Sequence, residues 1–381
     1  MYDAAAGVDI LLPPARSDHR RWSHPRRPLA RAGLLAIVVA TLAGCGSSHP
    51  LAVSTLAGDG TAGFRNGPAR QAEFDNPAGL AVDSAGNVFV ADNRQPRIRL
   101  IAAGSHAVST LAGDGKVGLR NGIARRAEFD LPTGVAVDRA GDVFVADSGN
   151  EVIRMIAAGS HTVSTLAGDG TRGFTNGPAA DARFSSPMGV AVDAAGNVYV
   201  ADAGNDRIRM IAAGSHTVST LAGSGAAGFL DGAAHVAEFD HPVSVAVDAA
   251  GDVFVADARN NRVRTISAGS RGVSTLAGRG KADFADGQAA DAEFDYPLGV
   301  SVDRAGNVYV ADSLNARVRV IAAGTQIVST LAGSGTAGFG NGAAQTAEFR
   351  GPSAVAATAA GTVYVADPLD ERIRTISEKA G

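Results

Sequence analysis

The sequence predicts an all-β fold, a six-bladed β-propeller, and three observations support that prediction. First, the segment Val-Ser-Thr-Leu-Ala-Gly recurs at a constant interval of 55 residues, beginning at Val53, Val108, Val163, Val218, Val273 and Val328. Second, each unit contains four short segments of small and β-branched residues separated by glycine-containing turns, which is the pattern of a propeller blade. Third, no segment keeps the apolar period of 3.6 residues that a helical repeat requires.

The first unit shows how the strands are assigned. The expected strands, in chain order, are Val53–Leu56, Gly79–Val82, Asn87–Ala91 and Arg97–Ala102. A tight turn at 83–87 separates the second from the third, with Gly86 where a positive φ is tolerated. Because small side chains suit the crowded axis of a propeller, we expect Gly79–Val82 to be innermost and the next Val-Ser-Thr-Leu segment to be outermost.

The two ends of the repeat array predict how the ring closes. The array begins with an outer strand, Val53–Leu56, and ends with a third strand, Arg372–Ile376. We therefore expect the N-terminal strand to complete the last blade, so that removal of residues 51–57 destabilises the whole disc.

Three segments of each unit carry a family resemblance. Pro77–Asp83, Gly86–Asp92 and Arg97–Arg99 together resemble the NHL repeat, and the third unit, with Pro187–Asp193 and Gly196–Asp202, resembles it more closely. The resemblance extends over about 330 residues and implies a six-bladed disc. The histidine that gives the family its name is absent, and residues such as Asp206, Asn261 and Ala316 stand in its place. The preceding Asn is replaced by Gln95 in the first unit and by Asp370 in the last, where Thr358 also replaces the first Asp.

The N-terminal region differs in composition from the repeats. Residues 1–44 hold six arginines and three aspartates. The last of these arginines precedes the apolar stretch Ala32–Leu42, which is too short to cross a bilayer and is typical of a signal peptide. Leu42-Ala43-Gly44-Cys45 resembles the lipobox of bacterial lipoproteins, which implies that Cys45, the single cysteine, is lipidated. We expect a signal peptide at 1–44, a lipidated tether at 45–51 and the propeller at 52–381. The resemblance implies a lipid-anchored protein of the bacterial cell envelope, outside the cytoplasm.

Charge and cysteine content exclude several classes of protein. The whole chain carries −4, and the three excess positive charges of residues 1–44 leave −7 for the remainder. RNA binding, as in the TRIM-NHL proteins, needs a basic face, so no nucleic-acid partner is expected. One cysteine excludes a disulfide framework and a cysteine-based zinc site. We expect a monomer.

The longest irregular stretch of each unit, 58–77 in the first, is expected on one face of the disc, here named the long-loop face. Each loop carries two anchors, Phe64 and Phe74 or their equivalents, which we interpret as pinning the loop to its blade; an aromatic ring for carbohydrate or peptide is the alternative. Asp92 and Arg97, with their equivalents, end adjacent strands and are expected to meet as a salt bridge or to bond to turn amides.

The pair of residues before each inner strand differs between blades and is the candidate ligand-binding ring, here named the channel-mouth pairs. These pairs are Asp75-Asn76, Asp130-Leu131, Ser185-Ser186, Asp240-His241, Asp295-Tyr296 and Arg350-Gly351. They are expected to surround the opening where a propeller most often binds its ligand, and their acidic content favours a polar or cationic partner.

Two functions from different classes follow from the sequence. The first is a lipid-anchored binding or scaffold protein that engages a protein or glycan through the long-loop face, with no cofactor and no catalytic residues. The alternative is a metal-dependent envelope lyase or hydrolase with its site at the channel mouth. Six-bladed lyases and lactonases hold their metal with histidines and carboxylates from several blades, whereas only His235 and His241, from one unit, are expected on this face. The sequence leaves open a Ca²⁺ ion in the channel that is bound by carboxylates alone.

Overall fold

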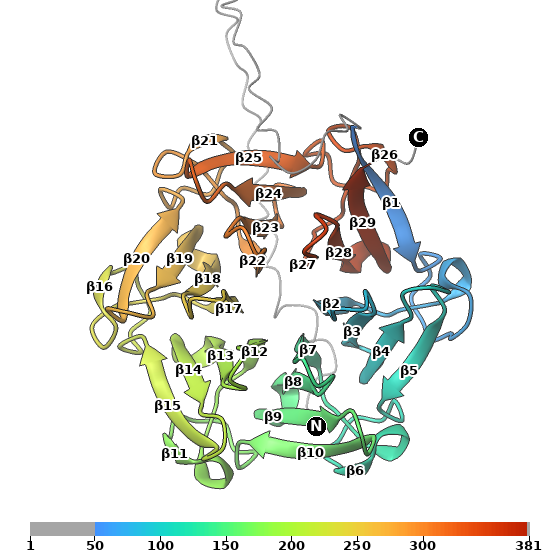
Figure 1. The fold of residues 1–381 in the computed structure, drawn as a ribbon, viewed down its shortest axis with the longest axis vertical. Coiled ribbons are helices and arrows are strands. Elements are labelled where there is room, and N and C mark those ends of the chain that lie inside the picture. Colours follow the sequence, from blue (N-terminus) through green and yellow to red (C-terminus); the bar gives the residue numbers. More distant parts are fainter. Residues whose placement is uncertain (1–49, 379–381) are drawn as a thin grey trace, which may run out of the picture. The chain divides into compact units, whose positions relative to one another are not determined.

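The computed structural model describes residues 50–378, which form six antiparallel sheets arranged as the blades of a ring (Figure 1). This confirms the all-β, six-bladed prediction. Residues 1–49 lie outside the described residues, and with them the expected signal peptide, Cys45 and most of the tether. Among residues 50–378, no helix is long and apolar enough to span a membrane.

Each blade runs from an inner strand at the axis to an outer strand at the rim, in the predicted order. Blade 1 comprises β2 (Pro77–Val82), β3 (Val88–Asp92), β4 (Arg97–Ile101) and β5 (Val108–Ala112). Blade 2 comprises β7 (Pro132–Val137), β8 (Val143–Asp147), β9 (Val152–Ala157) and β10 (Thr162–Ala167). Blade 3 comprises β12 (Pro187–Val192), β13 (Val198–Asp202), β14 (Arg207–Ile211) and β15 (Thr217–Ala222). Blade 4 comprises β17 (Pro242–Val247), β18 (Val253–Asp257), β19 (Arg262–Ile266) and β20 (Gly272–Ala277). Blade 5 comprises β22 (Pro297–Val302), β23 (Val308–Asp312), β24 (Arg317–Ile321) and β25 (Ile327–Ala332).

Blade 6 is completed by the two ends of the array, as predicted. It comprises β27 (Ala354–Ala357), β28 (Val363–Asp367), β29 (Arg372–Glu378) and, as the outer strand, β1 (Leu51–Ala57). The β1 strand pairs antiparallel with β29, with Leu51 opposite Glu378 and Thr55 opposite Arg374. The first and last strands therefore close the ring, and β1 begins at Leu51, one residue inside the expected tether.

Short strands not anticipated from the sequence extend most blades. Two-residue strands pair with the outer strands of blades 2 to 6: β6 (Gly122–Ile123), β11 (Gly177–Pro178), β16 (Gly232–Ala233), β21 (Gly287–Gln288) and β26 (Gly342–Ala343). Helical structure is limited, in the part of the chain described, to three-residue 3-10 turns. Those in the long loops are η2 (Ala69–Gln71), η3 (Ala124–Arg126) and η5 (Ala179–Asp181). Those after the second strands are η4 (Ser148–Asn150), η6 (Ala203–Asn205), η7 (Ala258–Asn260) and η8 (Pro368–Asp370).

The apolar core lies between neighbouring blades. Phe89 and Ile98 of blade 1 pack with Phe129 and Val143 of blade 2 in one cluster, and the cluster that joins blade 6 to blade 1 contains Ile373. The inner strands also contact one another directly, because a Cβ on Gly79 would lie 2.1 Å from the carbonyl oxygen of Thr133. This contact explains why the innermost strand needs small residues at that point.

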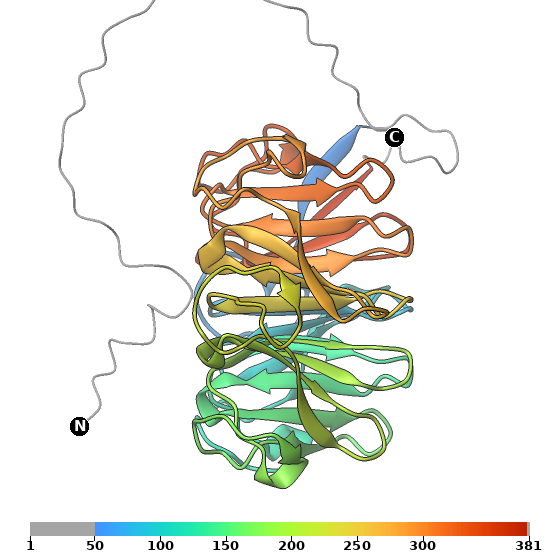
Figure 2. The same cartoon turned by 90° about the vertical axis from the view of Figure 1, so that its left-hand side faces the viewer.

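The two faces of the disc are different (Figure 2). Hairpin turns, such as the one at 83–87, project on one side, here named the turn face. The long loops with their 3-10 turns lie on the other side. Figure 1 views the disc from the turn face.

Candidate ligand-binding site

A buried ion pair fixes the long loops to each blade. The Nη1 of Arg99 donates to Asp92 Oδ2 at 2.6 Å, and both side chains are 0% exposed. The same pair recurs as Arg154–Asp147, Arg209–Asp202, Arg264–Asp257, Arg319–Asp312 and Arg374–Asp367. The expected pairing of Asp92 with Arg97 is therefore wrong, although Asp92 does bond to a turn amide, because Asp75 N–H donates to its Oδ1 at 2.8 Å.

The two loop phenylalanines hold this buried arginine from either side. The guanidinium of Arg99 lies 4.8 Å from the ring centre of Phe64 and 5.0 Å from that of Phe74. Its Nη2 donates to the carbonyl oxygen of Arg65 and to Asn66 Oδ1, both at 2.9 Å. These contacts tie the loop to the blade, so the interpretation of the phenylalanines as structural anchors is confirmed.

Arg97, the residue first expected to form the ion pair, has a different role. Its guanidinium stacks on Phe64 at 3.9 Å, and its Nη2 donates to the Asp114 carbonyl at 2.8 Å. In blade 2, Val152 and Leu119 replace the arginine and the phenylalanine together. The repeated charged residues of the blades thus serve the fold.

The channel-mouth pairs occupy equivalent backbone positions, and their backbone amides are used structurally. The first residue of each pair donates its N–H to the buried aspartate, as Asp75 does to Asp92 and Asp130 to Asp147. The second residue has a left-handed backbone, with φ of 58° at Asn76, 54° at Tyr296 and 82° at Gly351. Arg350 is the one exposed member, Ser185 and Tyr296 are buried, and the others are partly buried.

The second residue of most pairs is also bonded to the preceding blade. Asn76 N–H donates to Glu371 Oε2 at 2.6 Å, and His241 N–H donates to Asp206 Oδ1 at 2.8 Å. Ser186 and Tyr296 make the same contact to Glu151 and Asn261. The acceptors stand where the resemblance places the missing histidine, so this position joins neighbouring blades.

A second set of residues at the mouth was missed by the sequence analysis. The residue two places after each buried aspartate lies beside a channel-mouth pair, because Arg94 N–H donates to the Asp75 carbonyl at 3.1 Å and Gly149 N–H to the Asp130 carbonyl at 2.9 Å. We name these six the hub-loop residues: Arg94, Gly149, Gly204, Arg259, Leu314 and Leu369. Their variation between blades was visible in the sequence and is the signal that would have found them.

The hub-loop residues divide the mouth into unlike parts. Blades 2 and 3 have glycines, and a Cβ on Gly149 would meet the Asp130 carboxylate at 2.4 Å, so this carboxylate covers the backbone there. Blades 5 and 6 present Leu314 and Leu369, which are 44% and 49% exposed. Arg259 of blade 4 lies 3.6 Å from Asp240. The mouth therefore combines apolar, cationic and acidic positions, whereas the sequence predicted mainly acidic ones.

Five segments of the chain match a known repeat family. The profile of the NHL repeat family matches residues 74–99, 129–151, 184–209, 239–266 and 294–321. The chain carries NHL repeats. The matched segments belong to blades 1 to 5, and the replacements Thr358 and Asp370 lie in blade 6.

Relatives of this NHL propeller are longer proteins. The chain is 28% identical over 322 residues to protein SUPPRESSOR OF QUENCHING 1, chloroplastic, of Arabidopsis thaliana, covering 80% of this chain and 30% of that protein. It is 30% identical over 341 residues to NHL repeat-containing protein 2 of Bos taurus, covering 79% and 46%. The chain therefore spans less than half the length of these relatives. A solved auxiliary nutrient binding protein from Bacteroides thetaiotaomicron gives a TM-score of 0.66 at 14% identity, over 87% of this chain and 77% of that one, which shows a shared fold.

Burial alters the electrostatics of the NHL propeller's mouth. It raises the pKa of the Asp130 and Asp295 carboxyls above their ordinary value. The pKa of Glu371 rises to about 7, chiefly through burial and despite the hydrogen bond from Asn76, with Asp75 and Asp92 nearby. Within residues 50–378, no group of three or more His, Cys, Asp or Glu side chains is placed to hold a metal ion.

Proposed function

We propose that this NHL propeller is a binding or scaffold domain that engages a protein or glycan through the channel mouth of the long-loop face. We further propose that Cys45 is lipidated and anchors the domain in the bacterial cell envelope, outside the cytoplasm. In this proposal the chain acts as a monomer and without a cofactor.

The observation that carries the proposal is the division between repeated and variable residues. The residues that recur in the blades make contacts that stabilise the fold. They are the buried Asp–Arg pair in all six blades, and the loop phenylalanines and the stacked arginine in most of them. The channel-mouth pairs and the hub-loop residues vary at the same backbone positions, and Arg94, Leu314 and Leu369 are exposed there. A surface that differs in every blade around one opening suits recognition of one asymmetric ligand. The likeness to a nutrient binding protein of the same fold supports this proposal.

The binding proposal is tested with the chain from residue 45 to residue 381. Crosslinking pull-down from envelope fractions and a glycan array identify a retained ligand, whose affinity is then measured with Asp75→Ala, Asp240→Ala and Asp295→Ala. We expect weaker binding for these variants and no change for Ser84→Ala, a turn-face control that introduces the residue found at 194, 249 and 359. Retention of no protein or glycan, with no effect of the three variants, would contradict the proposal.

The anchoring proposal is tested separately. Metabolic labelling with a fatty-acid analogue should label the full-length chain and leave Cys45→Ser unlabelled. The variant should leave the membrane fraction for the soluble one. Equal labelling of both chains would contradict the lipid anchor and leave the binding proposal intact.

A further inference from the structure

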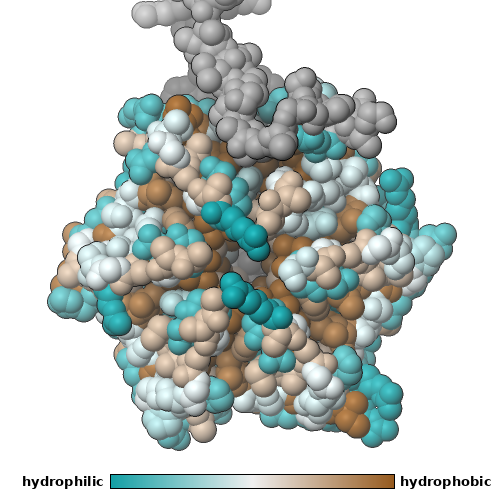
Figure 3. Space-filling model, viewed as in Figure 1, coloured by the Kyte–Doolittle hydropathy of each residue, from teal (hydrophilic) through white to brown (hydrophobic). Residues whose placement is uncertain are grey.

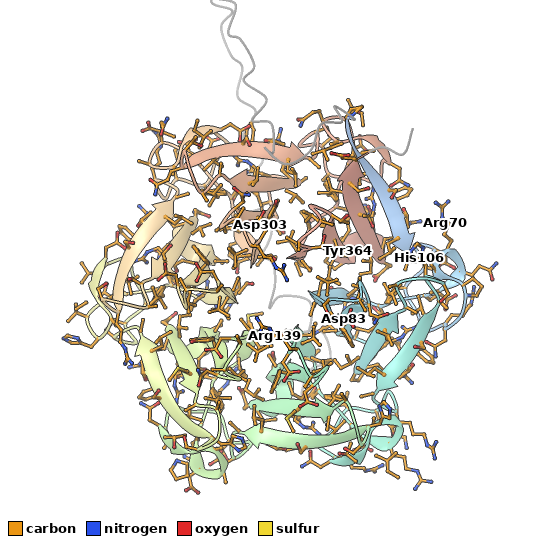
Figure 4. All side chains as sticks on the ribbon, viewed as in Figure 1. Arg70, Asp83, His106, Arg139, Asp303 and Tyr364 are labelled. Atoms are coloured by element: carbon orange, nitrogen blue, oxygen red, sulfur yellow. The ribbon has the colours of Figure 1, made fainter. Side chains whose placement is uncertain are left out.

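Two arginines stand at equivalent tips of the turn face, on opposite sides of the ring. The second residue of the turn between the inner and second strands is Ser84, Arg139, Ala194, Ala249, Arg304 or Ala359. Arg139 and Arg304 belong to blades 2 and 5, which lie three blades apart and therefore face each other across the axis. Arg139 lies at the inner rim in Figure 4, opposite Asp303, the neighbour of Arg304.

The central opening is visible on this face, and two long hydrophilic side chains extend over it from opposite sides (Figure 3). The turns that carry the arginines are held firmly by their own aspartates. Asp138 Oδ1 accepts from the N–H groups of Ala140 and Asp142, each at 2.9 Å. Asp303 Oδ1 accepts from Ala305 and Asn307 in the same way. Each arginine thus leaves the backbone at a fixed place beside the axis.

Neither guanidinium has a hydrogen-bond or ion-pair partner among residues 50–378. Other arginines are engaged: Arg99, in the third strand of blade 1, is buried with Asp92, and on the opposite face Arg259 lies 3.6 Å from Asp240. Asp303, the neighbour of Arg304, is engaged within its own turn: its Oδ2 accepts from Asn307 Nδ2 at 2.9 Å and from the Tyr309 hydroxyl at 3.1 Å. The two arginines are therefore exposed donors of the same charge, carried by turns on opposite sides of one opening.

A guanidinium binds carboxylate and phosphate oxygens through two parallel N–H donors. Two guanidinium groups that face each other across an opening repel, and a bound dianion relieves that repulsion. We propose that Arg139 and Arg304 form a binding site for a small dianion at the turn-face mouth of the channel. The anion is either one group shared by both arginines, such as phosphate, or a dicarboxylate with one end on each.

Isothermal titration with inorganic phosphate and with succinate, against sodium chloride at matched ionic strength, tests the site. We expect one dianion per chain, a loss of affinity of about tenfold or more for Arg139→Ala and for Arg304→Ala, and no detectable binding for the double variant. Both substitutions introduce the residue that three other blades have at this position, so the fold is retained. Stronger binding of succinate would indicate one carboxylate on each arginine, and stronger binding of phosphate a shared group.

Arg271→Gln is the matched control. Arg271 is an exposed arginine in an outer turn of the same face, and blade 5 has Gln326 at the equivalent position. This variant should bind the dianion as the parent chain does. Three results would overturn the proposed site. These are no binding of either phosphate or succinate, unchanged binding by the double variant, and an equal loss of affinity in Arg271→Gln. Asp75→Ala, on the long-loop face, should leave dianion binding unchanged, so this site and the proposed mouth site can fail independently.

Discussion

The buried Asp–Arg pair has one more hydrogen-bond donor in blades 2 to 5 than in blades 1 and 6, the two blades that meet at the ring closure. In blades 2 to 5 an asparagine completes the pair: Asn150 Nδ2 donates to Asp147 Oδ2 at 2.9 Å and to the Gly118 carbonyl at 2.8 Å, and Asn205, Asn260 and Asn315 do the same. Blade 1 has Gln95 and blade 6 has Asp370 at this position. The closing blades therefore lack one donor to a fully buried carboxylate.

In the internal blades this donor is one of the groups that lower the pKa of the buried aspartate. Burial raises the pKa of Asp147, Asp257 and Asp312 to about 6, against the lowering effect of their arginine and asparagine partners. In the closing blades burial raises the pKa of Asp92 and Asp367 to about 7. Asp367 also has Asp370 as a negative neighbour and a longer contact to Arg374, 3.0 Å against 2.6–2.7 Å elsewhere. Because its hydrogen bond lowers the pKa, the asparagine amide helps to keep the buried carboxylate ionised in the internal blades.

Removal of residues 51–57 should have the largest effect, because it takes the outer strand from a closing blade. The deletion leaves β29 without its outer partner and exposes the cluster that contains Val53, which is 2% exposed. We expect a loss of at least about 4 kcal/mol in the free energy of unfolding, since several buried apolar side chains and a full strand pairing are lost. Chemical denaturation followed by circular dichroism measures it. A chain that begins at residue 50 is the control, and equal midpoints for the two chains would contradict closure by β1.

Asn205→Asp should give blade 3 the same missing hydrogen-bond donor that blade 6 has at Asp370. The variant replaces a donor to Asp202 and to the Gly173 carbonyl with a carboxylate beside a buried carboxylate. We expect destabilisation by about 2–3 kcal/mol at pH 7, because a buried acceptor loses its donor and gains a like charge. Denaturation midpoints measure the loss, and Asn205→Gln, which introduces the residue of blade 1, should be intermediate. A change below the error of the measurement would show that the amide is not needed.

Asp370→Asn should produce the opposite change in blade 6. Asp370 is 7% exposed and its Oδ2 has no hydrogen-bond partner among residues 50–378. The amide is expected to donate to Asp367, and we predict stabilisation by about 1–2 kcal/mol at pH 7. The exposed Arg350, 3.9 Å from Asp370, loses little by the change. Destabilisation at pH 7 would mean that the carboxyl of Asp370 serves the fold as a proton donor.

The same variant should change how stability depends on pH. The folded chain holds the pKa of Asp367 at about 7, above its ordinary 3.8, and that of Asp370 is raised as well. The folded state thus binds these protons more tightly, and the resulting stability, complete below about pH 4, is lost as pH rises through about 7. The advantage of Asp370→Asn over the parent chain should grow over that interval. If the difference in denaturation midpoint between the variant and the parent chain stayed constant from pH 4 to pH 7.5, the raised pKa of Asp367 and Asp370 would be contradicted.

The sequence predicted the fold more fully than the contacts within it. Strand order and ring closure followed from the 55-residue interval, because a fixed repeat with an outer strand first and a third strand last leaves one way to complete the final blade. The partner of Asp92 did not follow. Arg97 is opposite Asp92 in the register, whereas Arg99 lies opposite Val90 on the same face, and sequence spacing does not choose between them. The choice depends on Phe64 and Phe74, which hold Arg99 in place.

Only part of the candidate site was predicted from the sequence, and the reason is similar. The channel-mouth pairs could be located because each precedes the proline of an inner strand. The hub-loop residues lie almost twenty positions further along the chain, and only a backbone hydrogen bond, such as that from Arg94 N–H to the Asp75 carbonyl, brings the two sets together. Local patterns in a single sequence carry no information about that contact.

The smallest expected effect concerns the contact between neighbouring blades. Asp206 accepts the His241 N–H, whereas Ala316, at the same position one blade before Gly351, has no acceptor to offer. Both residues have a left-handed backbone, with φ of 52° and 50°. Asp206→Ala should therefore cost about 1 kcal/mol through the lost hydrogen bond, and Ala316→Asp should gain somewhat less, since Gly351 N–H then acquires a partner. Asp206→Asn, which introduces the residue of blade 4, should leave the denaturation midpoint unchanged at pH 7. If it lowered the midpoint as far as alanine does, the charge of Asp206 and not its acceptor oxygen would join the blades.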